Sequence, residues 1–286
     1  LRSMDYQIDI DTTRAREDHD FLFRELDKTL RARQQAADWL WQELDWDYFE
    51  LVITGTDRLH HYLWPALEDD AHPRHQQALN YYRQVDALVG RLYQRFSALL
   101  DDDPAPSFML LSDHGSTAIV TEVYLNAWLR KQGLLRFTVE EPESLEHITA
   151  DSRVFAMEPA RLYLNLRGKF PGGCLSEDQV ANLKQELTQG FQALEFEGRK
   201  VVAHVVDRSE AYSGPLLDQG PDLLLVPHPG FDLKASLRQT SLFGRTALTG
   251  MHTWDDAFCS TGAPLQDNPC ITDLAPVILA RLTGEA

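Results

Sequence analysis

The sequence predicts an α/β fold, in which helices pack against the faces of a β-sheet. Long segments with apolar residues at helical spacing alternate with short apolar runs, and this alternation is typical of that class. The chain has 286 residues, of which 43% are hydrophobic, so it can bury a sizeable core. Because no repeat or low-complexity linker divides the chain, we expect a single α/β domain over residues 1–286, with an elaborated middle region around 139–250.

The first part of the chain alternates predicted helices with predicted strands. Apolar residues recur at helical spacing between charged ones from about 15 to 46, which indicates an amphipathic helix. The apolar run YFELVIT (48–54) follows and is predicted to be a buried strand. Residues 74–100 repeat the helical pattern after Pro73, a residue suited to a first helical turn. FMLLS (108–112) then predicts a second buried strand.

The second part of the chain is less regular. A helix is predicted at about 121–133, and an acidic irregular stretch follows it at 139–160. The remaining predicted elements are a half-exposed strand at 160–168, a helix at about 176–195, strands at 200–206 and 221–227, and a C-terminal helix at 272–284 that ends at a glycine.

Composition and charge exclude several classes of protein. The formal net charge of −17 argues against a broad basic surface for nucleic acid or anionic lipid. The three cysteines, Cys174, Cys259 and Cys270, show no CxxC pairing, which favours a reducing compartment. No run of about 18 apolar residues and no apolar leader is visible, so we expect a cytoplasmic protein that does not cross a membrane.

Acidic and imidazole side chains follow the first two predicted strands. In TDRLHH, Asp57 comes just after the first strand and His61 lies four residues further on. In SDHG, Asp113 and His114 follow the second strand directly, and His252 lies far along the chain in a third motif, GMH. Ligands in open α/β sheets bind beyond the carboxyl ends of the strands. Carboxylate and imidazole together suit zinc, manganese or iron.

Each motif alone also has a structural interpretation, which stays open. An aspartate at this place can cap the following helix, and DHG can form a turn. Trp64 and Trp254 are expected either to wall a substrate pocket or to be buried in ordinary core. Four other histidines are expected to be surface or core residues without a chemical role: His60, His72, His75 and His228.

The ordered set of TDRLHH, SDHG and GMH, closed by DLAPVILARLTG, resembles the alkaline phosphatase superfamily. The type I phosphodiesterase and nucleotide pyrophosphatase branch is the most similar, and LYLNLRGKFPGG and GPDLLLVPHPG also resemble its strands and loops. The resemblance runs from about residue 17 to the end of the chain. It implies an alkaline-phosphatase-like three-layer α/β/α sandwich that lacks its N-terminal strand or strands, so the domain is expected to be incomplete there.

The resemblance also implies a site for two divalent metal ions, with zinc expected first and manganese or iron as alternatives. By position, Asp57, His61 and His252 are expected to bind one ion, and Asp113 and His114 the second. Two ions about 4 Å apart would stabilise the attacking and leaving oxygens of an in-line displacement at phosphorus. In this arrangement the first strand would hold Asp57 rigid, and the loop after it would bring His61 back to the same ion.

The sequence departs from the family pattern at the nucleophile. Members have a strand ending in aspartate, and a Ser or Thr nucleophile, well upstream of the TDxxxH element, and no such segment is visible before Asp57. The local candidates for the missing aspartate and nucleophile are Asp11, Thr12 and Thr13, but these residues are better explained as part of an exposed connection before the predicted helix. We therefore expect a nucleophile from outside this sequence, and as partners the missing N-terminal segment or a second copy of the chain.

The predicted function is metal-dependent hydrolysis of phosphoric esters in a small phosphorylated substrate. The resemblance favours phosphodiester or nucleotide pyrophosphate bonds over monoesters. Two alternatives stay open: a phosphomutase or phosphonate hydrolase of the same superfamily, and a non-catalytic ligand-binding relative that lacks the nucleophile. Substrate choice is expected to depend on loops around 139–160 and 229–250.

Overall fold

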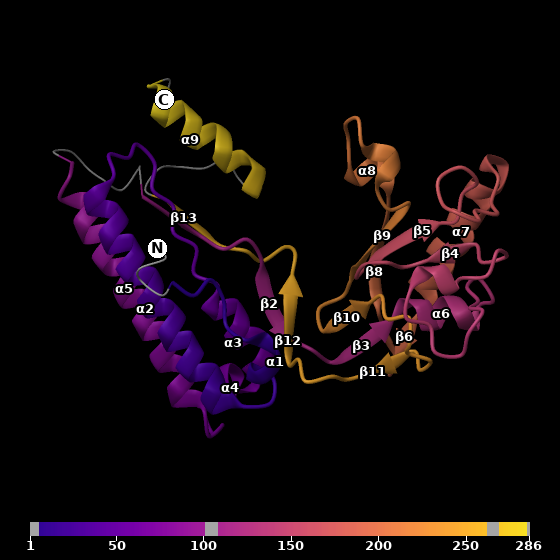
Figure 1. Ribbon diagram of the computed structural model, residues 1–286, viewed down its shortest axis with the longest axis horizontal. Coiled ribbons are helices and arrows are strands. Elements are labelled where there is room, and N and C mark those ends of the chain that lie inside the picture. The colour runs from indigo at the N-terminus through magenta and orange to yellow at the C-terminus, as the bar shows by residue number, and fades with distance from the viewer. Residues whose placement is uncertain (1–5, 101–107, 262–268, 285–286) are drawn as a thin grey trace. The chain divides into compact units, whose positions relative to one another are not determined.

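A computed structural model describes residues 6–100, 108–261 and 269–284 of the chain (Figure 1). The chain divides into two compact units. Unit 1 consists of Leu1–Ala118 and Ala247–Ala286, and unit 2 of Ile119–Thr246. The single domain expected over residues 1–286 stays a prediction, and its elaborated middle region falls almost wholly in unit 2.

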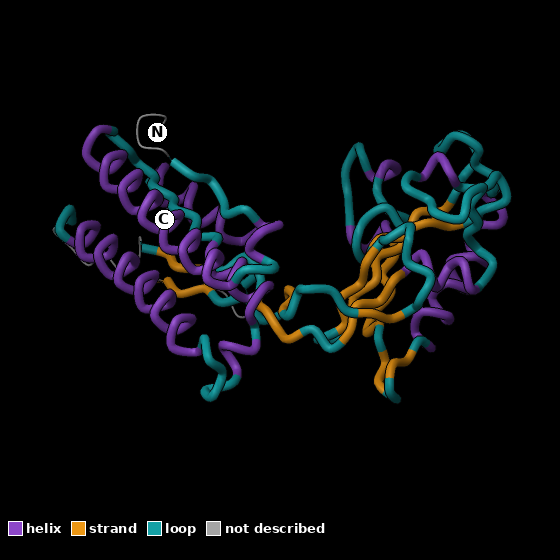
Figure 2. Tube along the Cα trace, turned by 60° about the horizontal axis from the view of Figure 1, so that its bottom comes forward, coloured by secondary structure: helices purple, strands orange, loops and turns teal. Residues whose placement is uncertain are grey.

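Unit 1 is built on two long helices at the predicted places, which lie side by side (Figures 1 and 2). Asp18 begins one of them, since its side chain accepts a hydrogen bond from the amide of Phe21 at 2.8 Å. The helices of this unit are α1 (Thr12–Ala15), α2 (His19–Glu43), α3 (Gly55–Leu63), α4 (Pro65–Glu68), α5 (His75–Ser97) and α9 (Leu274–Thr283), with the 3₁₀ turn η5 (Ile271–Asp273) before the last.

The apolar faces of α2, α3 and α5 meet in one core, where Leu22, Leu26, Leu59 and Tyr81 are almost completely buried. This core fixes α3, the helix that carries the first predicted metal ligands. At the other end of the chain, α9 stops at Gly284 in the left-handed conformation (φ 73°), as the glycine at that place predicts.

The described strands of unit 1 form two antiparallel ribbons. β1 (Met109–Leu111) pairs with β13 (Cys259–Thr261), and β2 (Gly115–Ala118) pairs with β12 (Gly250–Thr253). The strand predicted at 108–112 is therefore confirmed. The prediction that it is buried is wrong, because β1 has β13 as its one strand neighbour among the described residues, and Leu110 and Leu111 are 38% and 39% exposed.

Residues 48–54 form no strand, so the prediction of a buried strand there is wrong, and Val52 is 61% exposed. The backbone of this segment bonds to a side chain instead of to a neighbouring strand. Nε of the buried Arg33 donates to the carbonyl of Val52 at 2.9 Å, and its Nη2 donates to Thr54 Oγ1 at 2.9 Å. Nη2 also donates to the carbonyl of Ile8 at 2.7 Å. One guanidinium thus holds two segments of irregular chain.

Unit 2 is built on a four-stranded antiparallel sheet in the order β4, β5, β9, β8. These strands are β4 (Val154–Phe155), β5 (Arg161–Leu164), β9 (Leu223–Pro227) and β8 (Val202–Asp207). The strands predicted at 160–168, 200–206 and 221–227 are confirmed. β5 was expected to be half exposed, but it lies between two strands and Leu162, Tyr163 and Leu164 are all buried.

The other elements of unit 2 complete its core. A second sheet has the order β10, β3, β11, and α7 packs on β8 at the place predicted for a helix. These elements are β3 (Thr121–Tyr124), α6 (Leu125–Lys131), η3 (Leu145–His147), α7 (Glu177–Ala193), β6 (Glu195–Phe196), β7 (Arg199–Lys200), α8 (Arg208–Ala211), η4 (Leu217–Gln219), β10 (Phe231–Lys234) and β11 (Phe243–Gly244). The helix predicted at 121–133 begins as strand β3, because its backbone pairs on both sides.

The structure confirms the α/β class, with helices and several sheets in one chain (Figure 2). Within the described ranges, every helix is too short or too polar to pass through a membrane.

Candidate metal centre

Asp57 and His61 lie four residues apart on α3, and this spacing places both on one face of the helix. Nε2 of His61 lies 3.3 Å from Oδ1 of Asp57. The sequence predicts that a strand end holds Asp57 and that the following loop brings His61 back to the same ion. That expectation is wrong, because residues 55–63 are helical and one helical turn brings the two side chains together.

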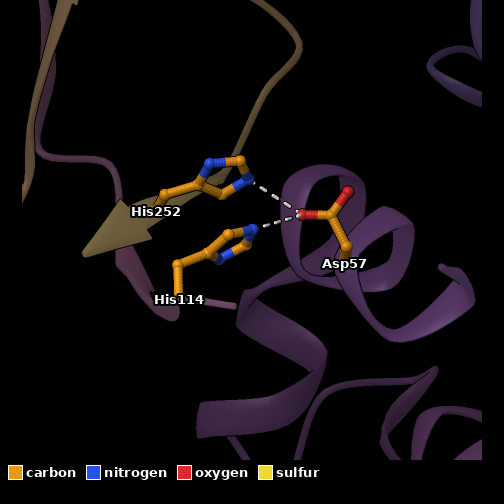
Figure 3. A group of neighbouring side chains, drawn as sticks. All are labelled: Asp57, His114 and His252. Atoms are coloured by element: carbon orange, nitrogen blue, oxygen red, sulfur yellow. Dashed lines mark hydrogen bonds and ion pairs between the residues drawn. The ribbon is translucent and has the colours of Figure 1, made fainter. Parts of the chain in front are cut away.

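His114 and His252 reach the same carboxylate from the paired strands of unit 1. His252 lies on β12, and its Nε2 is 2.9 Å from Asp57 Oδ1 and 2.9 Å from His61 Nε2. His114 directly precedes β2, and its Nε2 is 3.9 Å from Asp57 Oδ1. The rings of His114 and His252 stack with their centroids 3.6 Å apart, and Figure 3 shows both pointing at one oxygen of Asp57.

Backbone carbonyls orient two of these imidazoles. Nδ1 of His61 bonds to the carbonyl of Gly250 at 2.8 Å, and Nδ1 of His114 bonds to the carbonyl of Gly115 at 3.0 Å. A nitrogen that bonds to a carbonyl carries the proton, so the lone pair of each neutral ring is on Nε2, the atom that faces Asp57. This is the tautomer that a metal ion requires. Ligand atoms of Asp57, His114 and His252 lie within 4.8 Å of one another, which fits a single divalent cation.

The electrostatics of the cluster favour a charged Asp57. Burial opposes its ionisation, but hydrogen bonds with His252 and His61 outweigh burial and hold the pKa of Asp57 far below its ordinary value. The hydrogen bond with Asp57 in turn raises the pKa of His61. A proton and a metal ion therefore compete for Nε2 of His61.

Asp113 lies at the margin of this cluster. Its side chain is 78% exposed, and its Oδ1 is 3.4 Å from Nε2 of His114. The structure thus brings Asp57, His61, His114 and His252 together and leaves Asp113 beside them. The division of the five residues between two ions stays a prediction.

The other predicted candidates have ordinary surroundings. Asp11 caps α1, since its Oδ1 accepts from the amides of Thr13 and Arg14 at 3.0 and 3.1 Å. The ring of Trp64 is half buried and meets His60 edge-on, whereas Trp254 is 65% exposed.

Two groups beside the cluster were not predicted from the sequence. His60, expected to have no chemical role, bonds through Nδ1 to Ser116 Oγ at 2.9 Å and through Nε2 to the hydroxyl of Tyr82. Arg58 donates from Nη1 to Asp57 Oδ2 at 2.9 Å. Its position directly after Asp57 gave no signal, because consecutive side chains on a helix do not face each other. No local pattern around Asp9, which bonds to the same guanidinium, points to that contact.

Comparison with a known structure identifies the fold. The phosphonoacetate hydrolase from Sinorhizobium meliloti, crystallised in complex with phosphonoformate, is similar to this chain with a TM-score of 0.53 and 16% sequence identity. The similarity covers 91% of this chain and 56% of the solved one, so the chain spans about half the length of that protein. It confirms an alkaline-phosphatase-like α/β fold.

Comparison of sequences identifies the family. A search of curated proteins gave no match. The sequence model of a family described as type I phosphodiesterase / nucleotide pyrophosphatase matches residues 3–255, a range that contains all five predicted ligands. Because this match extends over most of the chain, the chain belongs to the type I phosphodiesterase/nucleotide pyrophosphatase family.

Proposed function

We propose that the chain is part of a metal-dependent hydrolase of phosphoric esters that cleaves phosphodiester or nucleotide pyrophosphate bonds in a small substrate. The observation that carries the proposal is the approach of three imidazole Nε2 atoms, from His61, His114 and His252, to one carboxylate oxygen of Asp57. Family membership supports the same chemistry.

The metal ligands have defined tasks in this proposal. Asp57, His61 and His252 would hold one ion, and His114 with Asp113 a second, with zinc expected and manganese or iron as the alternatives. Bound ions would act as Lewis acids on a phosphoryl oxygen and neutralise its charge, which the acidic chain cannot do by itself. The carbonyls of Gly250 and Gly115 orient the rings of His61 and His114, so that the lone pair on each Nε2 would be available to an ion.

We propose that the nucleophile does not come from the residues of this chain itself. A Ser or Thr hydroxyl would come from a further segment or from a second copy of the chain, as the sequence predicts. Among the described residues, Ser116 is the first with a hydroxyl group after His114, and its Oγ forms a hydrogen bond with Nδ1 of His60.

Phosphonate hydrolysis is a second candidate function. The observation that favours it is the similar fold of a phosphonoacetate hydrolase. Both substrates carry non-bridging phosphoryl oxygens that bound metal ions would polarise, so the same ligand cluster would serve either reaction. Activity on phosphonoacetate that exceeds activity on a chromogenic phosphodiester would favour this candidate.

Zinc binding to the purified chain tests the metal centre without depending on the nucleophile. Titration calorimetry of the wild type is compared with His252→Ala and with His204→Ala, an exposed histidine of unit 2. We expect His252→Ala to weaken zinc binding at least about 10-fold, whereas His204→Ala binds like the wild type. Equal zinc affinity in His252→Ala and the wild type would overturn the assignment.

A further inference from the structure

The two oxygens of Asp57 have different partners. Oδ1 faces the imidazoles, with His252 Nε2 at 2.9 Å and His61 Nε2 at 3.3 Å. Oδ2 accepts a hydrogen bond from Arg58 Nη1 at 2.9 Å. A carboxylate with an arginine on one oxygen presents only the other oxygen to a metal ion.

The contact between Asp57 and Arg58 is unusual for neighbours on a helix. Consecutive side chains on a helix do not face each other, so Arg58 has to turn back along α3 to reach Asp57. An arginine with no further partner would exchange among many rotamers, because its side chain carries about 2 kcal/mol of rotamer entropy. A second contact must therefore hold the guanidinium in place.

Asp9 supplies that contact from a different segment of unit 1. Nε of Arg58 lies 3.2 Å from each carboxylate oxygen of Asp9, and Nη2 lies 2.6 Å from Oδ2. This fork geometry is the strong, directional form of an arginine–carboxylate pair. The pair is partly buried, with 26% of the Arg58 side chain and 33% of the Asp9 side chain exposed.

Asp9 is itself fixed by its own segment. Its Oδ1 accepts from the amide of Ile10 at 2.8 Å, and its carbonyl accepts from Gln7 Nε2 at 2.9 Å. Arg33 holds the carbonyl of the preceding residue, Ile8, at 2.7 Å. These hydrogen bonds hold the carboxylate of Asp9 in a fixed position, from which it can anchor Arg58.

We propose that Arg58, anchored by Asp9, is a positioning residue that fixes Asp57 so that Oδ1 alone binds the metal ion. The inference rests on the proposed metal centre. Asp9 has a second effect, since an arginine beside a divalent cation repels it, and the charge of Asp9 cancels that repulsion. The Asp9–Arg58 pair therefore orients the ligand without lowering the affinity of the site for cations.

The test compares zinc affinity, by titration calorimetry, in the wild type, Asp9→Asn, Arg58→Gln and the double variant. We expect Asp9→Asn to weaken zinc binding about 10-fold, because Arg58 loses its anchor and its charge is no longer cancelled. We expect Arg58→Gln to weaken zinc binding as well, because Asp57 then loses the group that fixes it. The loss in the double variant should be smaller than the product of the two single losses, since both act through Asp57.

A matched control is the exposed ion pair of Arg74 and Asp20, whose Nη1 and Oδ1 atoms lie 2.5 Å apart in the same unit. Asp20→Asn removes the same charge, and we expect it to bind zinc like the wild type. The visible spectrum of bound Co²⁺ separates orientation from stability. Arg58→Gln should change the band positions and intensities, because Asp57 is then free to bind with both oxygens, and a purely structural role would leave the spectrum of the folded variant unchanged.

The outcomes separate the two proposals. If the wild type binds zinc and His252→Ala does not, while Asp9→Asn and Arg58→Gln bind as tightly as the wild type, the positioning role is overturned and the metal centre stands. If the wild type and His252→Ala give the same zinc titration, the metal centre is overturned and the positioning role with it.

Discussion

The two units of the chain hold their segments in place by different means. In unit 2, strands pair into sheets of four and three strands besides the short ribbon of β6 and β7, and its core buries Leu162, Leu187 and Phe191 completely. In unit 1, the strands form ribbons of two, and Arg33 holds the backbone of segment 48–54. The predicted ligands all lie in unit 1. The site is therefore held by the helix α3 and the two-stranded ribbon of β2 and β12, and not by a larger sheet.

The largest effect that we predict is in the core of unit 2. Phe191 is fully buried, and the centroid of its ring lies 4.1 Å from the centroid of the Trp128 ring. Phe191→Ala should lower the free energy of unfolding by about 3–5 kcal/mol, measured by urea denaturation. Leu110→Ala on the exposed ribbon of unit 1 is the comparison and should cost less than about 1 kcal/mol. Equal costs would contradict the difference between the units.

Arg33→Met tests the hydrogen bonds that hold segment 48–54 in unit 1, where no described strand pairs with it. The substitution keeps much of the buried volume but removes donors to Val52, Thr54 and Ile8. We expect a loss of about 2–4 kcal/mol, because hydrogen bonds from a charged donor are among the strongest and their acceptors lose a partner. Arg33→Lys should recover part of that loss. A loss below about 1 kcal/mol would mean that packing alone holds segment 48–54.

Gly250→Ala tests the close approach of β12 to α3. A Cβ at Gly250 would lie 2.3 Å from the carbonyl oxygen of His60, which is backbone and cannot move aside cheaply. We expect a loss of about 1–3 kcal/mol and weaker zinc binding, since the carbonyl of Gly250 also orients His61. Gly90→Ala is the control. Nothing lies within 4 Å of that position in α5, so it should stabilise the protein by roughly 0.5–1 kcal/mol.

The smallest predicted effect is a pH dependence in unit 2. Burial opposes ionisation of Asp207, but the bond from Lys184 Nζ at 2.6 Å and the hydrogen bonds from the amide and hydroxyl of Ser209 together outweigh it, and the pKa falls from 3.8 to about 2. Because the pKa is lowered in the folded protein, this stabilisation is complete above pH 3.8 and is lost as the pH falls toward 2. Asp207→Asn should cost about 1 kcal/mol at pH 6, and the difference from the wild type should shrink by pH 3. A constant difference would count against the ion pair.

Periodicity predicted those parts of the fold whose pattern is local. The long helices α2, α5 and α7 follow from apolar spacing, and β9 follows from its continuous apolar run. The same reasoning failed for 48–54, since an apolar run shows that a segment can pair but not whether a partner strand lies beside it. It failed again at 121–133, where two strands pair with residues that have an acceptable helical pattern.

The candidate site was predictable as a set of residue types and not as a geometry. The residues that converge were predicted by the resemblance of the ordered set TDRLHH, SDHG and GMH to one family, since each motif alone also has a structural interpretation. The sequence could not reveal that Asp57 and His61 share one turn of α3, since the helix begins just where the apolar run ends. It could not reveal Asp9 as a partner of Arg58 either, because that contact joins segments 49 positions apart.

The insertion of unit 2 between β2 and β12 has a consequence for folding kinetics. His114 and His252 meet only after these strands pair, which closes a loop that contains the whole of unit 2. Closing a loop of unfolded chain costs entropy that rises with its length. In the folded unit 2, β3 and β11 pair near its two ends, with Glu122 opposite Gly244. If unit 2 folds first, only a few residues on either side remain to be closed into a loop. We therefore expect the cation site to form late in folding, at a rate limited by the folding of unit 2.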